Sequence, residues 1–319
     1  MIEFYLPQIH DSGLFDFNKF FFDLYKNNKD YFNDDVFINS VYGCFNNSPW
    51  TGGRKNNLSF VLDVEQCKKK LDYIESLGIK IRFVFSNSLI NKKMLDDKVS
   101  NELASYANKN GNYIILLSDL LYDYLKERYK NYKYVLSMTA LITDINKYNE
   151  LTKKYDMVVL DWRLNKSIEK LKTIEDKDKI EIIANMLCAT NCDNVVTHYK
   201  HVDIKNATGL KIKQKKTCKM SDKIRVSNSS FFDYIISTYK NKSSVNSVIT
   251  LDEIYKYRDM GFKKFKLIGR DETHIGPMFI SYMYYLIKKE KWNNVFDMLR
   301  KTKYSQQAEE VIPYIEELR

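Results

Sequence analysis

The chain has 319 residues, a formal net charge of +10 and 44% hydrophobic residues, so it is long enough for two ordinary domains or one large barrel. The N-terminal residues lack the basic start and apolar segment of a secretory signal, and no apolar run approaches the roughly 18 residues of a membrane span. We therefore expect a soluble, cytoplasmic protein whose five cysteines do not form a disulfide framework.

Short β-rich runs alternate with longer amphipathic stretches along most of the chain. The strand-like runs are residues 35–44, 80–87, 112–118, 134–140, 157–162, 179–188 and 262–269. The helix-like stretches are residues 63–78, 95–109, 119–131, 144–155, 165–176 and 250–261. Near-continuous apolar strands that alternate with helices indicate parallel strands covered on both faces. The number of units favours an α/β fold, a (β/α)8 TIM-like barrel either complete or with strands missing, over a doubly wound sheet.

Three regions are expected from this alternation. Residues 1–34 read as an N-terminal helical lead-in, residues 35–290 as the barrel, and residues 291–319 as closing C-terminal helices. Within the barrel, the polar and lysine-rich residues 202–249 read as an insertion after the sixth predicted strand. No Gly-rich GxGxxG loop follows the first predicted strand and no GxxxxGK[ST] occurs, so dinucleotide and P-loop functions lose their main support.

Polar side chains follow several predicted strands, at the end where β/α barrels gather their working residues. Asp161 and Arg270 are the candidate catalytic residues, because charges at a strand end need partners. Asn87 and Asn185 follow other strands and are candidate substrate-binding residues. The loop 46–55, "NNSPWTGGRK", could hold an anionic or aromatic ligand through the two candidate residues Trp50 and Arg54, and a plain turn is the alternative.

A second candidate site is the stretch "NMLCATNCDNVVTHYKH", residues 185–201. Cys188 and Cys192 are four residues apart, so one helical turn would bring their sulfurs toward one ion or cluster. Cys218 lies among lysines in the predicted insertion, and neighbouring lysines favour the thiolate that binds metal. Together with His198, these three cysteines form the candidate metal-ligand set.

Two metals compete for this set. The spacing fits none of the usual zinc patterns, whereas an iron–sulfur cluster accepts ligands from distant loops. Cys44, after the first predicted strand, is a second choice for the fourth ligand, and a ligand from outside the chain is the third. Cys67 on a predicted helix is expected to be inert core. Ordinary buried thiols with surface histidines remain the alternative for the whole set.

The order of β/α units, Cys188 and Cys192 followed by "HYKH", the further Cys218, and "FKLIGR" at 265–270 resemble the collagenase-like peptidase family U-32. The resemblance implies a β/α barrel and, as in several relatives, a 4Fe–4S cluster that supports oxygen-independent hydroxylation of RNA bases or a quinone precursor. It implies that Cys188, Cys192 and Cys218 match cluster cysteines and that Arg270 matches the basic residue closing the last strand motif. The family's fuller cysteine pattern is not reproduced, and a fourth cysteine is not evident.

The leading hypothesis is therefore an iron–sulfur barrel enzyme, redox or hydroxylase-like, that acts on RNA or a small anionic or aromatic substrate. The first alternative is a basic RNA-binding or adaptor barrel with a structural metal, although joint enrichment in Lys, Asn, Ile and Tyr also explains the positive charge. The peptidase activity in the family name finds no independent support, because no Ser-His-Asp or Cys-His arrangement stands out. A further alternative is a metal-free lyase or hydrolase that uses Asp161 and Glu181 as acid and base.

Overall fold

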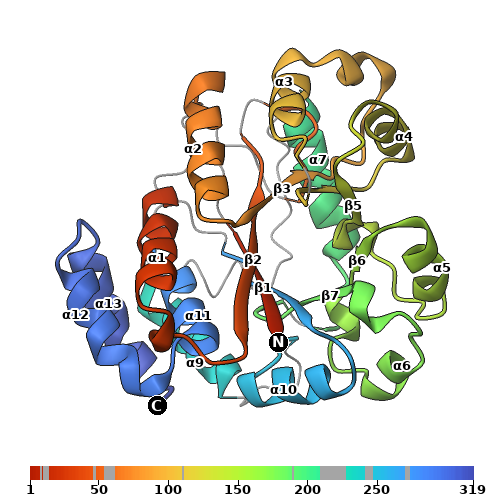
Figure 1. Cartoon of the computed structure of the whole chain (residues 1–319). Coiled ribbons are helices and arrows are strands. Elements are labelled where there is room, and N and C mark those ends of the chain that lie inside the picture. The colour runs from red at the N-terminus through yellow and green to blue at the C-terminus, as the bar shows by residue number, and fades with distance from the viewer. Residues whose placement is uncertain are drawn as a thin grey trace.

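Eight parallel strands close into a barrel in strict chain order, with helices around the outside (Figure 1). The strands are β1 (Ile2–Leu6), β2 (Val36–Gly43), β3 (Lys80–Phe85), β4 (Tyr113–Leu116), β5 (Lys133–Leu136), β6 (Met157–Val159), β7 (Ile180–Ile183) and β8 (Lys264–Lys266). This computed structural model describes residues 1–7, 9, 14–45, 48–53, 62–109, 111–188, 190–208, 228–240, 247–269 and 274–319. The expectation of a (β/α)8 barrel is confirmed, and the barrel is closed.

Helices follow most strands. They are α1 (Phe15–Asn27), α2 (Val64–Ser76), α3 (Lys98–Tyr106), α4 (Asp119–Arg128), α5 (Lys147–Lys154), α6 (Ile168–Lys172), α7 (Val195–Thr208), α9 (Asn228–Tyr239), α10 (Leu251–Asp259), α11 (Gly276–Leu286), α12 (Trp292–Arg300) and α13 (Ser305–Glu316). Short 3-10 helices are η1 (Lys29–Tyr31), η2 (Lys92–Asp96), η3 (Met138–Ala140), η4 (Trp162–Leu164), η5 (Lys177–Lys179) and η6 (Lys289–Lys291). In the described part of the chain, none of these helices has the length and apolar character to cross a membrane.

The barrel begins at residue 2, which corrects the expectation that residues 1–34 are only a helical lead-in. β1 pairs in parallel with β2 on one side and with β8 on the other, so this five-residue strand closes the barrel. The run 179–188, taken as the sixth strand, contains β7 and is the seventh. A strand of only five residues leaves little periodic pattern from which to predict it.

Local sequence explains where several elements begin and end. Asp63 caps α2 in a capping box with Gln66, and Thr250 caps α10 in the same way with Glu253. Gly78, just past α2, has a φ of 73°, a left-handed conformation that glycine adopts without steric cost. These residues explain where α2 and α10 begin and where α2 ends.

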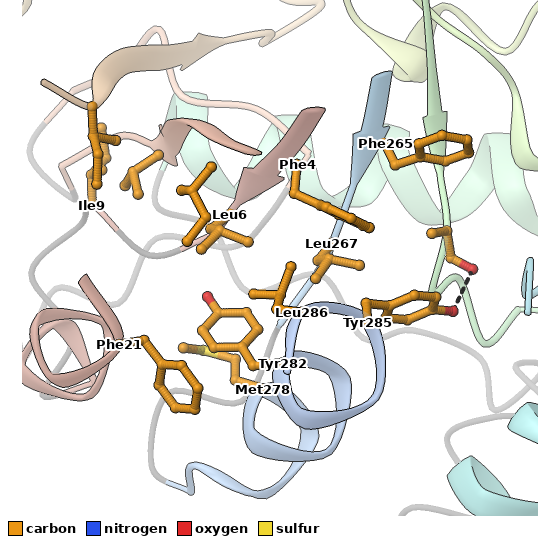
Figure 2. Close-up of a cluster of buried hydrophobic side chains, with 14 of the residues drawn as sticks. Phe4, Leu6, Ile9, Phe21, Phe265, Leu267, Met278, Tyr282, Tyr285 and Leu286 are labelled. Carbon is orange, nitrogen blue, oxygen red and sulfur yellow. Dashed lines mark hydrogen bonds between the residues drawn. The ribbon is translucent and has the colours of Figure 1, made fainter. Parts of the chain in front are cut away.

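The main core lies between the barrel wall and the helices. Figure 2 shows part of it, where Phe4 and Leu6 of β1 and Phe265 of β8 face side chains of α11 such as Tyr282 and Tyr285. These side chains are fully buried, and the Tyr285 hydroxyl donates to the carbonyl of Ile249 at 2.7 Å. Aromatic side chains of this size bury large areas and dominate core energetics. The alternate strand residues point the other way, into the barrel.

The described part of the predicted insertion 202–249 is helical. The end of α7 and the whole of α9 fall in it, although its composition was hard to fit to one helix. α9 packs against α11 through Tyr239, whose hydroxyl hydrogen-bonds the Ser281 hydroxyl at 2.8 Å. Residues 209–227 and 241–246 lie outside the described residues.

Candidate functional site at the C-terminal mouth

The C-terminal ends of the strands meet at one mouth of the barrel, where such folds carry their active sites. Asp161 follows β6 there and its side chain is buried. Its carboxylate caps η4 by accepting a hydrogen bond from the Arg163 backbone N–H at 2.9 Å. The backbone N–H of Asp161 donates to the Tyr148 hydroxyl at 3.0 Å. This candidate catalytic residue is therefore held rigidly at the mouth.

Asp161 also binds the Arg163 side chain through both carboxylate oxygens. Arg163 Nε donates to Oδ1 at 2.9 Å and Nη2 donates to Oδ2 at 2.6 Å. This bidentate pairing raises the pKa of Arg163 further above its ordinary value. The carboxylate of Asp161 is therefore paired with a permanent cation, and its catalytic role stays a prediction.

Arg163 is fixed by a third contact in the loop after β5. Its Nη2 donates to the Leu141 carbonyl at 3.1 Å, and Leu141 has a φ of 56°. A non-glycine residue in this region costs free energy, and such residues cluster at functional sites. Arg163 Nη1 makes no hydrogen bond to any residue that the structure describes, and the side chain is 21% exposed. The mouth therefore presents an oriented cation with a spare donor.

Aromatic and sulfur-containing side chains form the rest of the mouth. Trp162 of η4 and Tyr199 of α7 pack edge to face with ring centroids 6.3 Å apart. Both are buried, together with Met138 and Met186, in a cluster that continues into the barrel interior. Trp162 is 1% exposed, yet its indole Nε1 has no hydrogen-bond partner among the described residues.

α7 covers this part of the mouth. Its residues Val195, Tyr199 and Val202 are buried at the spacing of one helical face. Asp203 accepts hydrogen bonds from the backbone N–H of Ser88 at 3.1 Å and from the Ser88 hydroxyl, and Asn206 donates to the Thr51 carbonyl at 3.1 Å. Burial raises the pKa of Asp203, with the two Ser88 hydrogen bonds opposing that shift.

Cys188 and Cys192 lie at the mouth, in the loop between β7 and α7. α7 begins only at Val195, so the pair is not on a helical turn, which corrects the geometry expected from its spacing. Both thiols are partly buried against the interior cluster, and Cys192 lies within electrostatic reach of Arg163. His198 is on α7 with its ring against Tyr199, at a centroid distance of 5.3 Å.

The donor set of an iron–sulfur or zinc site is incomplete in the described part of the chain. No group of three or more His, Cys, Asp or Glu side chains suited to a metal occurs among the described residues. Cys218 lies outside them, so the predicted set stays a prediction. Cys44 is buried in the outer core, a different cluster from that of Cys188 and Cys192, and Cys67 is buried core on α2 as expected.

The candidate substrate-binding residues in the described part of the chain are held by protein contacts. Trp50 is fully buried and donates to the Met94 carbonyl at 2.6 Å, and Asn87 donates to the Pro49 carbonyl at 3.0 Å. Asn185 uses its amide to join β7 to Ile268 after β8, at 2.7 Å and 2.6 Å. Their roles as ligand contacts stay predictions. Arg54 and Arg270 lie outside the described residues.

The two glycines beside Trp50 have structural reasons. A Cβ on Gly52 would lie 2.2 Å from the Ser86 carbonyl carbon, so only glycine permits this loop to pack on the end of β3. Gly53 has a φ of 75°, which favours glycine. Packing thus accounts for the Gly pair without a ligand.

The barrel interior below the mouth contains a buried ion pair that the sequence did not single out. Arg82 of β3 and Glu181 of β7 are both fully buried, with Nη1 and Oε2 2.5 Å apart. Lys266 Nζ lies 3.5 Å from Glu181 Oε1, and the Arg82 guanidinium lies over the Tyr5 ring at 4.1 Å. Burial raises the pKa of Tyr5, so its phenol remains neutral beside these charges. A Glu181 locked in this pair does not support the acid–base hypothesis.

Three residues of the mouth were assigned no role from the sequence: Arg163, Trp162 and Tyr199. Arg163 lies two residues after Asp161, a spacing at which a capping carboxylate can pair with a nearby cation. The sequence could therefore have indicated this pair. Trp162 read as the end of an apolar strand, and nothing in the sequence places α7 over it. Contacts between elements distant in sequence require the folded chain.

The fold and the mouth define a closed (β/α)8-barrel protein with a polar and aromatic site at the C-terminal ends of β5 to β7. A solved structure of a U32 peptidase is similar in fold, with 11% sequence identity and a TM-score of 0.49. The similarity covers 85% of this chain and 94% of that one. No family model and no curated protein matches the chain.

Proposed function

We propose that the chain is a barrel enzyme that binds a small anionic, ring-bearing substrate at its C-terminal mouth. The single observation that supports this proposal is Arg163, oriented by a bidentate bond to the buried Asp161 beside the aromatic pair Trp162 and Tyr199. A preorganised guanidinium next to aromatic rings suits a carboxylate or phosphate attached to a ring.

Each component has a distinct role in this proposal. Arg163 binds the anionic group through Nη1, and Asp161 with the Leu141 carbonyl fixes its orientation. Trp162 and Tyr199 bound the ring, and α7 excludes water from the bound substrate. A water-poor site strengthens the interaction of Arg163 with the anion, because screening is weaker there.

The test is the binding of uridine 5′-monophosphate, a phosphate attached to a ring and a fragment of RNA, measured by isothermal titration calorimetry. Arg163→Met should weaken binding about 10- to 100-fold, since a hydrogen bond to a charged group is lost. The matched control is Arg128→Met, which removes another arginine that lies over an aromatic ring, that of Tyr124, on the distant surface of α4. No binding by the wild-type protein, or equal binding by both variants, would overturn the proposal.

A redox or hydroxylase-like activity with a 4Fe–4S cluster is the second candidate. The observation that favours it is the position of Cys188 and Cys192, which both lie at the mouth on the interior cluster, with Cys192 near the positive charge of Arg163. Cys218 and His198 would complete the ligand set in this proposal. Zinc is the alternative metal for the same residues.

Anaerobic purification followed by iron and acid-labile sulfide analysis tests this candidate. The expected result is stoichiometric iron and sulfide with a broad visible absorption band, lost in Cys188→Ala and Cys192→Ala and retained in Cys67→Ala. Zinc without sulfide would replace the cluster by a structural metal. Colourless, metal-free protein would exclude both.

Binding of RNA as an adaptor is a separate outcome of these experiments. If the basic chain binds single-stranded RNA mainly through phosphates, affinity falls steeply with salt and the slope reports the number of contacts. Such binding would be insensitive to Arg163→Met, because one cation among many contributes little. Salt-sensitive RNA binding with unchanged affinity in this variant favours the adaptor over the enzyme.

A further inference from the structure

The chain has three tryptophans, and their indole N–H groups differ in how they are satisfied. All three rings are at most 1% exposed. Trp50 Nε1 donates to the Met94 carbonyl at 2.6 Å, and Trp292 Nε1 donates to the Ile287 carbonyl at 3.2 Å. Trp162 Nε1 is buried and has no acceptor within the part of the chain that the structure describes. Because a buried indole usually finds a partner, the exception requires a physical explanation.

A buried water explains this exception poorly. An internal water needs two to four polar partners to offset its immobilisation. Trp162 belongs to a hydrophobic cluster that includes Met138, Met186 and Val195, and these apolar side chains offer a water no strong hydrogen-bond partner. The charged group beside the ring is the Arg163 guanidinium, whose carbon lies 6.0 Å from the ring centroid, and a guanidinium has no acceptor.

Trp162, which carries the unpaired donor, lies at the mouth of the barrel. Trp162 is the first residue of η4, next to Arg163 and directly after the strand that delivers Asp161 to the mouth. Its ring is 1% exposed and packs edge to face against Tyr199 of α7. The two satisfied indoles, in contrast, belong to the outer core.

We propose that the Trp162 indole N–H is the hydrogen-bond donor to the ligand's ring, so that the ligand carries a carbonyl oxygen or ring-nitrogen acceptor on a planar ring beside its anionic group. This inference rests on the proposed function and specifies its substrate class: an acceptor-bearing ring such as a pyrimidine, rather than a plain hydrocarbon ring. Arg163 binds the anionic group, and Trp162 donates a hydrogen bond to the acceptor on the ring.

Because the indole is covered by Tyr199, the ligand reaches the N–H only when that phenol ring is displaced. α7 is attached at this end of the mouth by Asp203 to Ser88 and by Asn206 to Thr51. Trp162 is thus a specificity-determining residue at a covered position.

The experiment is a two-dimensional ¹⁵N–¹H spectrum of the indole groups of the full chain, titrated with two probes. Uridine 5′-monophosphate has ring carbonyls, whereas phenyl phosphate has the same anionic group on a ring without acceptors. Three indole signals are expected, one for each tryptophan, and Trp50→Phe, Trp162→Phe and Trp292→Phe each remove one, so Trp162 can be assigned even if one variant fails to fold.

Uridine 5′-monophosphate should move the Trp162 signal downfield and leave the other two in place, and phenyl phosphate should leave all three in place. Trp162→Phe keeps an aromatic ring and removes the donor. This substitution should weaken the binding of uridine 5′-monophosphate about 3- to 10-fold, the usual effect of one neutral hydrogen bond. It should not weaken the binding of phenyl phosphate. Trp292→Phe serves as the control and should change neither affinity.

The outcomes separate this inference from the proposed function. If uridine 5′-monophosphate binds in a manner that depends on Arg163 while the Trp162 signal and the affinity of Trp162→Phe are unchanged, the inference is wrong and the proposed function stands. If neither probe binds the wild-type protein, both are wrong. Equal shifts of the Trp162 signal by both probes would also overturn the inference, because phenyl phosphate has no ring acceptor.

Discussion

The outer core and the barrel interior of this protein differ in how they treat polar groups. Between the barrel wall and the helices, Trp50, Trp292 and Tyr285 are buried with their polar atoms satisfied. Inside the barrel and at its mouth, buried polar atoms of Arg82, Glu181, Ser86 and Trp162 have no aligned hydrogen-bond partner among the residues that the structure describes. An unsatisfied buried group costs about 1–3 kcal/mol, so Trp162 at the mouth carries a cost that Trp50 and Trp292 avoid.

Glu181→Gln should give the largest change in stability. It leaves the Arg82 guanidinium buried without its counter-charge, and Lys266 loses a partner as well. Removing one member of a buried ion pair costs about 3–5 kcal/mol. We expect that loss in the free energy of unfolding, measured by urea denaturation with circular dichroism.

The control is Glu309→Gln, which removes an exposed partner of Arg300 and should cost less than about 1 kcal/mol. The double variant Arg82→Met with Glu181→Leu should recover most of the lost stability, because two apolar side chains then replace the pair. If the Glu181→Gln protein is as stable as the Glu309→Gln control, the buried ion pair contributes no more to the free energy of unfolding than a surface ion pair.

Substitutions of two tryptophans should give intermediate changes in the free energy of unfolding. Trp50→Phe leaves a cavity and an unsatisfied Met94 carbonyl, so the free energy of unfolding should fall by about 1–3 kcal/mol. Trp162→Phe leaves a similar cavity but removes an unsatisfied donor, so the loss should be smaller by about 1–2 kcal/mol. Chemical denaturation of both ligand-free proteins measures the difference, and equal losses would mean that the Trp162 donor is satisfied in solution.

The substitution Asp203→Asn should give the smallest change in stability. Burial raises its pKa in the folded protein above the ordinary value of about 3.9. Because the pKa of Asp203 is raised in the folded protein, protonation of Asp203 stabilises the folded state. This stabilisation is complete below about pH 3.9 and is lost as the pH rises through the pKa of the folded protein. Asp203→Asn should therefore raise the melting temperature at pH 7, and the difference from wild type should shrink as pH falls.

Thermal unfolding followed between pH 7 and pH 4 gives this comparison, with Asp123→Asn on the exposed face of α4 as the control. The Asp203→Asn side chain keeps a carbonyl oxygen for the two Ser88 donors, so the contact of α7 with the loop after β3 should persist. A melting temperature lowered by Asp203→Asn at pH 7 would mean that the charge stabilises the attachment of α7.

The sequence determined most of the architecture of this protein. Alternating apolar runs and amphipathic stretches placed seven of the eight strands, because the 2-residue and 3.6-residue periods are local properties of the chain. The first strand escaped notice, since five residues before α1 carry too little pattern and their pairing with β8 spans the whole chain. The sequence also placed Asp161, Cys188 and Cys192 at the correct end of the barrel.

Only the tertiary structure decided what these residues contact. Asp161 binds Arg163, Glu181 faces Arg82 across the barrel interior, and α7 covers Trp162, although nothing local encodes the last two contacts. The charge of a residue and its strand can be read from the sequence, but its partner depends on how eight strands close around a common axis. Chain closure brings together side chains about a hundred residues apart, as in the pair of Arg82 and Glu181 inside the barrel.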